Sequence, residues 1–229
     1  FMRNEALKHS AAHLLAMAVK ELFPKAKLGV GPPLEEGFYY DFGNVKFTDE
    51  DLPRLENKMK DLVKKNYQII RTEVSREEAK KILKDEKFKL ELLEQIKGTI
   101  SFYKQGDFID LCEGPHVEST GKIRAFKLTK LAGAYWKGDQ KNEQMQRIYG
   151  VVFEDEKGLQ DYLKQREEAE KRDHVKLGKE LDLFSLSDVA PGFPFFHEKG
   201  AIIWNEIEEY LRGLYKKNDY GFVVTPHIL

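Results

Sequence analysis

Two pairs of side chains able to bind a metal or move protons stand out in this sequence. His9 and His13 lie four residues apart in an apolar segment that predicts a helix, so both imidazoles face the same side about one turn apart. Cys112 and His116 have the same separation, but Pro115 disfavours a helix before it, and we expect this pair in a loop. Two short-spaced pairs of nitrogen and sulfur ligands, far apart in the chain, are a common way to assemble a zinc-type site.

Both pairs also have a purely structural interpretation. His9 and His13 would then be half-buried residues on a helix surface, and Cys112 would be a small buried apolar side chain. If the pairs instead meet, the four side chains can line one pocket for a metal, a water molecule or a substrate. The residues leave open a metal set of His9, His13, Cys112 and His116, and also a metal-free site in which a histidine acts as the base near neutral pH.

A second signal is a basic stretch over residues 122–141, which contains a single acidic residue, Asp139. Its basic residues are Lys122, Arg124, Lys127, Lys130, Lys137 and Lys141. Phe126, Tyr135 and Trp136 are interleaved with them, a pattern that suits a phosphate backbone and stacked bases. The alternative is a solvated pair of strands whose aromatic residues belong to the core.

The elements that must position these groups are a mixture of helices and strands. Apolar residues recur at helical spacing over 4–23 and 49–65, and Ser75 with Glu78 forms a capping box that predicts a third helix. A fourth helix is expected over 87–96. Strands are expected within 27–42 and over 67–74, 99–103, 108–111, 125–131 and 146–153. This mixture predicts an α+β fold.

The remainder of the chain changes character. Residues 159–179 are highly charged and contain few large apolar residues, as in a solvated helix that connects two domains. We therefore place a domain boundary near residue 180. An amphipathic helix is expected over 200–217, followed by a strand over 221–226 that enters a proline. The apolar residues of that helix are Ile203, Ile207, Leu211 and Leu214.

Composition excludes several classes of protein. Of the 229 residues, 41% are hydrophobic and 34% are charged, as in an ordinary folded protein. No apolar run approaches the ~18 residues of a membrane span, so we expect no membrane partner. Cys112 is the only cysteine, which rules out an internal disulfide and favours a cytoplasmic location. Because the net charge is −1, any nucleic-acid contact must come from local patches. The chain ends in an apolar run, and we expect it to be a fragment.

Several motifs carry a resemblance to a known family. His9-Ser10-x-x-His13-Leu14-Leu15 with Cys112-x-Gly114-Pro115-His116 resembles the HxxxH and CxxxH editing domain shared by threonyl- and alanyl-tRNA synthetases. The flanking motifs are similar to the threonyl branch, and they are Gly37-Phe38-Tyr39-Tyr40-Asp41, Gly133-Ala134-Tyr135-Trp136-Lys137-Gly138-Asp139 and Gln146-Arg147-Ile148-Tyr149-Gly150. Ala190-Pro191-Gly192, the helix over 200–217 and Thr225-Pro226 resemble the opening of a class II synthetase core.

The resemblance implies a domain plan for the whole chain. Residues 1–155 would be the editing domain, with helices packed on antiparallel sheets. Residues 156–180 would be a charged linker helix. Residues 181–229 would be the N-terminal part of the class II catalytic domain, an antiparallel-sheet domain of which only the first helix and strand, the motif 1 region, are included.

The resemblance also implies a reaction and its residues. The family's editing pocket hydrolyses the ester that joins serine to tRNA(Thr), because one missing methyl group yields only ~1–3 kcal/mol of discrimination during synthesis. The implied catalytic residues are His9, His13, Lys89, Cys112 and His116. Asp110 would receive the ammonium group of the substrate, and Tyr40 would line the same wall. The alternatives are an exposed helix lysine for Lys89 and a plain turn residue for Asp110.

Cofactors and partners follow from the same resemblance. The expected partner is tRNA(Thr) mischarged with serine, contacted through Lys122, Arg124, Lys127, Lys130 and Lys137. We expect no metal in the editing pocket, although zinc there is the alternative. ATP, magnesium and a catalytic zinc would belong to the longer parent enzyme alone, which would pair as a homodimer through motif 1. Two rivals remain, an alanyl-type zinc-dependent trans-editing hydrolase and a non-catalytic module that binds tRNA or stores metal.

Overall fold

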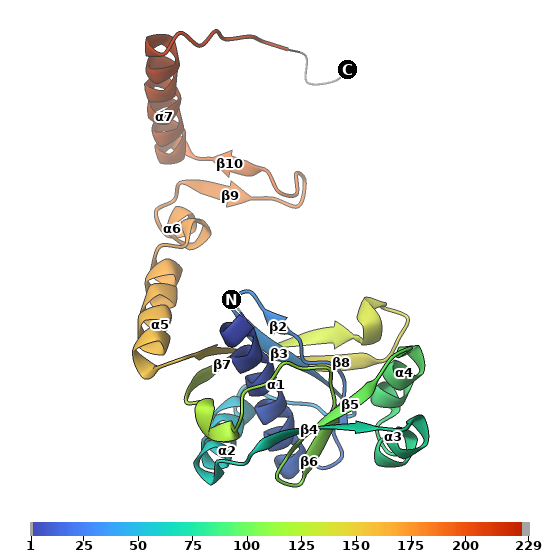
Figure 1. The fold of residues 1–229 in the computed structure, drawn as a ribbon. Coiled ribbons are helices and arrows are strands. Elements are labelled where there is room, and N and C mark those ends of the chain that lie inside the picture. The colour runs from blue at the N-terminus through green and yellow to red at the C-terminus, as the bar shows by residue number, and fades with distance from the viewer. Residues whose placement is uncertain (1, 226–229) are drawn as a thin grey trace. The chain divides into compact units, whose positions relative to one another are not determined.

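The computed structural model describes residues 2–225, which divide after Leu163 into two compact units (Figure 1). The first unit contains both pairs of site residues. Its helices are α1 (Met2–Leu22), α2 (Asp51–Lys65), α3 (Arg76–Ile82) and α4 (Lys87–Gln95), with short 3-10 turns η1 (Thr120–Lys122) and η2 (Trp136–Gly138). Its strands are β1 (Lys27–Leu28), β2 (Pro33–Leu34), β3 (Gly37–Gly43), β4 (Ile69–Val74), β5 (Ile100–Gln105), β6 (Phe108–Leu111), β7 (Ala125–Tyr135) and β8 (Gln144–Phe153).

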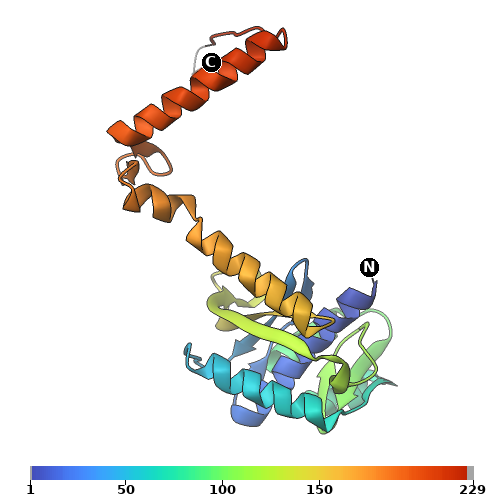
Figure 2. The same cartoon turned by 90° about the vertical axis from the view of Figure 1, so that its left-hand side faces the viewer.

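The larger sheet is antiparallel and has the order β1-β3-β8-β7, with β2 paired to β3. Side chains alternate along these strands, so Phe38, Tyr40 and Phe42 of β3 all face the same core and are 0% exposed. Helix α1 packs on this face beside α2 (Figure 2). The α+β prediction with antiparallel sheets is confirmed for this unit.

Helix α1 is buried for most of its length. Every residue from Ala11 to Val19 is buried, which includes the polar His13. A helix that is covered on nearly all sides lies inside a domain rather than on its surface. The polar residues on α1 that are not exposed therefore need partners within the protein, and this requirement shapes the site.

A smaller antiparallel sheet of order β4-β5-β6 completes the first unit. Helices α3 and α4 pack on it through Ala79, Leu83 and Leu93. The capping box expected at the start of α3 is present, with Ser75 and Glu78 bonded reciprocally. The long β7–β8 hairpin extends to the pair Tyr135 and Gln144, several residues beyond the expected strand ends, because cross-strand pairing continues there.

The second unit begins inside a charged helical segment. The single helix expected over 159–179 is instead two helices, α5 (Glu156–Lys171) and α6 (His174–Glu180). The break has a local cause, because the Asp173 side chain accepts a 2.8 Å hydrogen bond from the Lys176 amide and starts a new helix. The unit continues with β9 (Phe184–Leu186), β10 (Pro194–Phe196) and α7 (Glu198–Lys217), which confirms the expected amphipathic helix.

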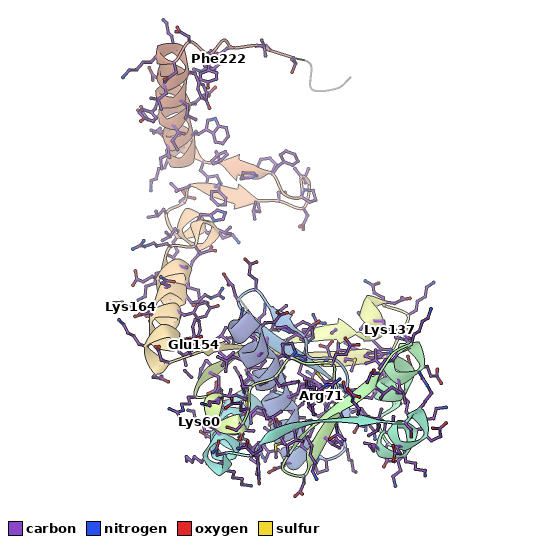
Figure 3. All side chains as sticks on the ribbon, viewed as in Figure 1. Lys60, Arg71, Lys137, Glu154, Lys164 and Phe222 are labelled. Carbon is purple, nitrogen blue, oxygen red and sulfur yellow. The ribbon has the colours of Figure 1, made fainter. Side chains whose placement is uncertain are left out.

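The strand expected over 221–226 is not formed in the part that the structure describes. Residues 221–225 have no strand partner among the described residues, and Pro226 lies outside them. Phe222 instead lies near the end of α7, with its ring centroid 5.8 Å from that of Tyr215 (Figure 3). A strand without a neighbouring strand leaves its backbone hydrogen bonds unpaired, so an extended sequence pattern alone does not produce one.

None of the helices described combines the length and the apolar character needed to cross a membrane. The expected domain limits at residues 155 and 180 stay predictions.

Candidate functional site

Four side chains from two distant segments meet at one point of the first unit. His9 and His13 lie one turn apart on α1, with ring centroids 5.2 Å apart. Cys112 and His116 come from the loop after β6, as the position of Pro115 predicted. The Cys112 Sγ lies 3.2 Å from Nε2 of His9 and 3.2 Å from Nε2 of His116. One ligand atom from each residue lies within 4.8 Å of the others, so the two sequence pairs form a single cluster.

The β5–β6 hairpin and the loop after it hold the second pair against α1. The side-chain amide of Gln105 donates a 3.1 Å hydrogen bond to the main-chain carbonyl of His13. The amide N–H of Val117 donates a 2.9 Å hydrogen bond to the hydroxyl oxygen of Ser10. These bonds span 92 and 107 residues of sequence, so the cluster depends on tertiary structure.

The loop that carries Cys112 and His116 needs glycine at one position. Gly114 has a φ of +85°, in the region that favours glycine, and a Cβ there would lie 2.3 Å from the hydroxyl oxygen of Tyr103. Tyr103 also packs on His116, with ring centroids 4.2 Å apart. The tyrosine therefore both limits the approach of the loop and orients the imidazole.

A buried carboxylate lies beside the cluster. Asp110 is a residue of β6 and is 0% exposed, so it is not a plain turn residue. The Tyr40 hydroxyl donates a 2.7 Å hydrogen bond to Asp110 Oδ2, and Nδ1 of His13 lies 3.8 Å from the same oxygen. The Lys89 ammonium lies 2.7 Å from Oδ1. Because Lys89 is only 3% exposed, the alternative of an exposed helix lysine is wrong.

One oxygen of Asp110 has room for a further donor. The Lys89 ammonium forms an ion pair with Oδ1, which among the buried side-chain polar atoms of the described residues is the one without a regular hydrogen bond. A carboxylate oxygen has two lone pairs, so Oδ1 can accept a further donor beside the Lys89 ammonium. A ligand ammonium or hydroxyl group would satisfy this oxygen.

Burial keeps the three imidazoles of the cluster uncharged at neutral pH. It lowers the pKa of His9, and it lowers the pKa of His13 well below its usual value, with His9 and Lys89 acting in the same direction on His13. The pKa of His116 falls to about 2, mainly through burial and further through His13 and His9. The rings therefore enter any reaction as neutral donors and acceptors of protons.

Burial has the opposite effect on the acidic groups of the site. It raises the pKa of the Cys112 thiol to about 12, although a 3.3 Å hydrogen bond from the Gly114 amide partly opposes this. It also raises the pKa of Tyr40, and the neighbouring Asp110 adds to the increase. Cys112 is thus a thiol at neutral pH, whereas sulfur chemistry requires the thiolate. Tyr40 stays protonated and able to donate to Asp110.

The donor set of the cluster fits one zinc ion. Imidazole nitrogen and cysteine sulfur are both zinc ligands, and the four ligand atoms, the number of a tetrahedral site, lie within 4.8 Å of one another. Ligation would require the thiol of Cys112 to lose its proton and the ring nitrogens to present free lone pairs. The hydrogen bonds described above use the same atoms, so these atoms can form either a hydrogen-bonded cluster or a metal site.

The basic stretch lies along β7 and the turns at its ends. All five residues expected to contact tRNA are exposed, namely Lys122, Arg124, Lys127, Lys130 and Lys137. Lys127 lies 3.0 Å from Glu56, and Lys137 lies 3.1 Å from Glu91, so two of the five already pair with acidic side chains. Lys137 belongs to the turn between β7 and β8 (Figure 3). A strand of this length spans roughly 35 Å, which separates the two ends of the stretch.

The aromatic residues of that stretch are mostly structural. Phe126 and Trp136 are each 5% exposed and belong to the core, so the expectation that they stack on bases is wrong. Trp136 is held by a 2.8 Å hydrogen bond from Nε1 to Glu91. Tyr135 is exposed. Phosphate contacts by the basic side chains stay a prediction.

Three residues of the site were not expected from the sequence, Ser10, Tyr103 and Gln105. Ser10 lies between the two histidines of α1 and is 0% exposed, so its position next to His9 was an available signal. Tyr103 and Gln105 lie on β5, where alternation marks a buried face but does not say which element covers it.

Comparison with known proteins defines the class of this domain. A family described as the threonyl and alanyl tRNA synthetase second additional domain matches residues 100–149. The matched segment contains Asp110, Cys112 and His116, together with the strands on either side of them. The segment that carries Asp110, Cys112 and His116 is therefore similar to this synthetase domain.

The relatives specify one branch of that class. The chain is 52% identical to a threonine–tRNA ligase of Clostridium kluyveri and 50% identical to one of Marinobacter nauticus, over 99% and 98% of its length. It is 51% identical to a threonine–tRNA ligase of Acetivibrio thermocellus over 99% of its length. The chain belongs to the threonyl-tRNA synthetase family, and it spans about 36% of the length of these relatives.

Proposed function

We propose that this chain carries the proofreading site of a threonyl-tRNA synthetase and hydrolyses the ester between serine and tRNA(Thr). The observation that supports this most directly is the cluster of His9, His13, Cys112 and His116 beside a buried carboxylate, Asp110, whose oxygen Oδ1 can accept a further donor beside Lys89. The cluster offers neutral groups that can handle protons, and Asp110 offers a site for the ammonium group of an amino acid.

In the proposed reaction, a water molecule attacks the seryl carbonyl carbon, the bond from that carbon to the ribose oxygen breaks, and the proton removed from the water passes to the ribose oxygen. His9 takes the proton of the attacking water, because it is the less buried imidazole on α1 and is neutral at physiological pH. Attack by the Cys112 sulfur is disfavoured by its raised pKa of about 12. We therefore assign Cys112 and His116 to holding the geometry of the cluster, and propose that the reaction has no thioester intermediate.

Asp110 and Lys89 bind and orient the substrate in this proposal. The substrate ammonium would donate to Asp110 Oδ1, while the 2.7 Å hydrogen bond from Tyr40 holds the other oxygen. Lys89, paired with Asp110 at 2.7 Å, acts as an electrostatic group rather than as a base. It stabilises negative charge that develops on the carbonyl oxygen during the attack.

Discrimination between serine and threonine depends on a single methyl group. A pocket that admits the smaller side chain can exclude the larger one by steric clash, whereas a pocket built for threonine gains only ~1–3 kcal/mol over serine. A hydrolytic pocket of this kind is the second sieve. The packed surroundings of His13 and Tyr40 suit such exclusion, because neither side chain has free space to move.

The wider setting of the proposed function includes a longer enzyme. Residues 1–155 would be the editing domain, 156–180 a linker and 181–229 the start of a class II catalytic domain. Threonine activation with ATP, magnesium and a catalytic zinc would belong to the longer protein, in the cytoplasm. Trp204 and Ile207 of α7 are more than half exposed, which supports a homodimer contact through this region. The basic residues along β7 would bind the tRNA backbone.

The fit of the cluster to zinc favours one alternative, a metal-dependent hydrolase of the alanyl type. His9, His13, Cys112 and His116 would hold the ion, which would supply an activated water molecule when bound. In that case Asp110 and Lys89 would keep their roles toward the substrate.

The test is a deacylation assay with the whole chain on seryl- and threonyl-tRNA(Thr), with and without a chelator. We expect rapid loss of serine only, unaffected by the chelator, abolished in His9→Ala and unchanged in His174→Ala. His174 is an exposed histidine of the second unit and serves as the matched control. Chelator-sensitive hydrolysis would establish the zinc alternative. Salt-dependent tRNA binding without hydrolysis would leave a binding module and overturn the proposal.

A further inference from the structure

Ser10 is a polar side chain of the site that the proposed reaction does not use. It lies on α1 between His9 and His13 and is 0% exposed. Its hydroxyl oxygen lies 3.0 Å from Nδ1 of His116 and accepts the 2.9 Å hydrogen bond from the Val117 amide. The hydroxyl therefore connects α1 with the loop that follows β6.

We propose that Ser10 is a positioning residue that holds His116 in the tautomer with its proton on Nε2. The hydroxyl oxygen already accepts a hydrogen bond from Val117, so its own proton must go to another acceptor. Within the described part of the chain, Nδ1 of His116 is the acceptor that lies within reach. A buried hydroxyl is rarely left without an acceptor, so Nδ1 is the lone-pair nitrogen and Nε2 carries the hydrogen.

This tautomer determines which group donates in the hydrogen bond between His116 and Cys112. Nε2 of His116 donates to the Cys112 sulfur across 3.2 Å, and the same sulfur lies 3.2 Å from Nε2 of His9. The series of hydrogen bonds starts at Ser10 and ends at His9, the imidazole assigned to the attacking water. Ser10 would thus set the hydrogen-bonding state of His9 without contacting the substrate, a consequence that rests on the proposed function.

The same tautomer disfavours metal ligation by His116. A metal ligand must present a lone pair, but Nε2 carries the proton and Nδ1 accepts the Ser10 hydroxyl. Both ring nitrogens are then occupied. Ligation through Nε2 would require the ring proton to move to Nδ1, so that Nδ1 donates to Ser10 instead of accepting from it. The hydroxyl therefore favours the hydrogen-bonded cluster over the metal-bound one.

The experiment is nitrogen NMR of the imidazoles in the free protein at neutral pH, which identifies the protonated nitrogen of each ring without substrate. We expect the lone pair on Nδ1 of His116 in the unmodified protein, a mixture of tautomers in Ser10→Ala, and the original state in Ser10→Thr. Ser119→Ala is the control, because Ser119 is a buried serine that donates to Asn66 at 2.7 Å. A proton on Nδ1 in the unmodified protein, or an unchanged tautomer in Ser10→Ala, would overturn the proposal.

Deacylation kinetics give a second and separate measurement. Ser10→Ala should lower kcat about tenfold, the size expected for one lost hydrogen bond, while KM stays the same and Ser10→Thr restores activity. Equal kcat in Ser10→Ala and the unmodified protein would contradict the role of the tautomer in hydrolysis. If the unmodified protein hydrolyses nothing, the proposed function fails, whereas the NMR result still decides the tautomer.

Discussion

The buried pair of Asp110 and Lys89 allows a quantitative test of how the site is held together. Asp110 is 0% and Lys89 3% exposed, and the charged groups lie 2.7 Å apart. Asp110→Asn keeps the shape of the side chain and an acceptor for Tyr40, but leaves the ammonium without a counter-charge. Removing one partner of a buried ion pair costs about 3–5 kcal/mol, so we expect a loss of this size in the free energy of unfolding.

A double-mutant cycle separates the pair from its surroundings. Lys89→Met removes the ammonium and keeps much of the apolar stem, and by itself it should also destabilise because it removes the partner of a buried carboxyl group. The double variant leaves no unpaired charge. We therefore expect its destabilisation to be smaller than the sum of the two single effects by about 1–3 kcal/mol.

The assay is urea unfolding followed by tryptophan fluorescence. Trp136 is buried in the first unit, whereas Trp204 is exposed on α7 in the second, so a Trp204→Phe background makes the signal report on the first unit alone. Glu73→Gln, at the exposed ion pair with Arg71, is the matched control and should leave the midpoint unchanged. Single effects that add within about 0.5 kcal/mol would refute the coupling between Asp110 and Lys89.

The burial of the cluster and the geometry of its loop support three further predictions. Because the imidazole pKa values are lowered in the folded state, the unfolded state binds more protons below pH ~6.5. The free energy of unfolding should therefore fall with falling pH by about 1.4 kcal/mol per pH unit for each such histidine. Urea unfolding at several pH values measures this dependence, and it should be weaker in His116→Gln. The Cys112 thiol, with a pKa of about 12, should react with iodoacetamide far more slowly in the folded protein at pH 8 than in urea, and equal rates would contradict its burial. Gly114→Ala should destabilise the first unit by about 1–3 kcal/mol through its positive φ and its clash with Tyr103, and an unchanged unfolding midpoint would show that the loop can adopt another conformation.

Local features of the site could be predicted because they depend on neighbours in the chain. The spacing of His9 and His13 places them on one face of any helix, and Pro115 excludes a helix around Cys112. The capping box at Ser75 is likewise a short-range pattern that defines its own hydrogen bonds. The amphipathic period of residues 200–217 was enough to predict α7.

Predictions that depended on burial were less successful. Trp136 and Phe126 looked available for stacking, yet Phe126 lies in the core that the larger sheet forms with α1 and α2, and Trp136 packs on Phe88 of α4. Lys89 was expected in the site with an exposed helix lysine as the alternative, and only its burial beside Asp110 decided against that alternative. A residue type states what a side chain can do, whereas its solvent exposure depends on elements that are distant in sequence.

The sequence by itself determined the chemical groups of this site, the helix and loop that carry them, and the family to which the chain belongs. Tertiary structure alone decided that two pairs about a hundred residues apart converge, as the 3.2 Å contact between Cys112 and His9 across 103 residues demonstrates. It also decided which groups lose water, and therefore that the imidazoles stay neutral and the thiol stays protonated. Local spacing sets the direction of a side chain, but pKa values and hydrogen-bond partners arise from packing between elements that no local pattern brings together.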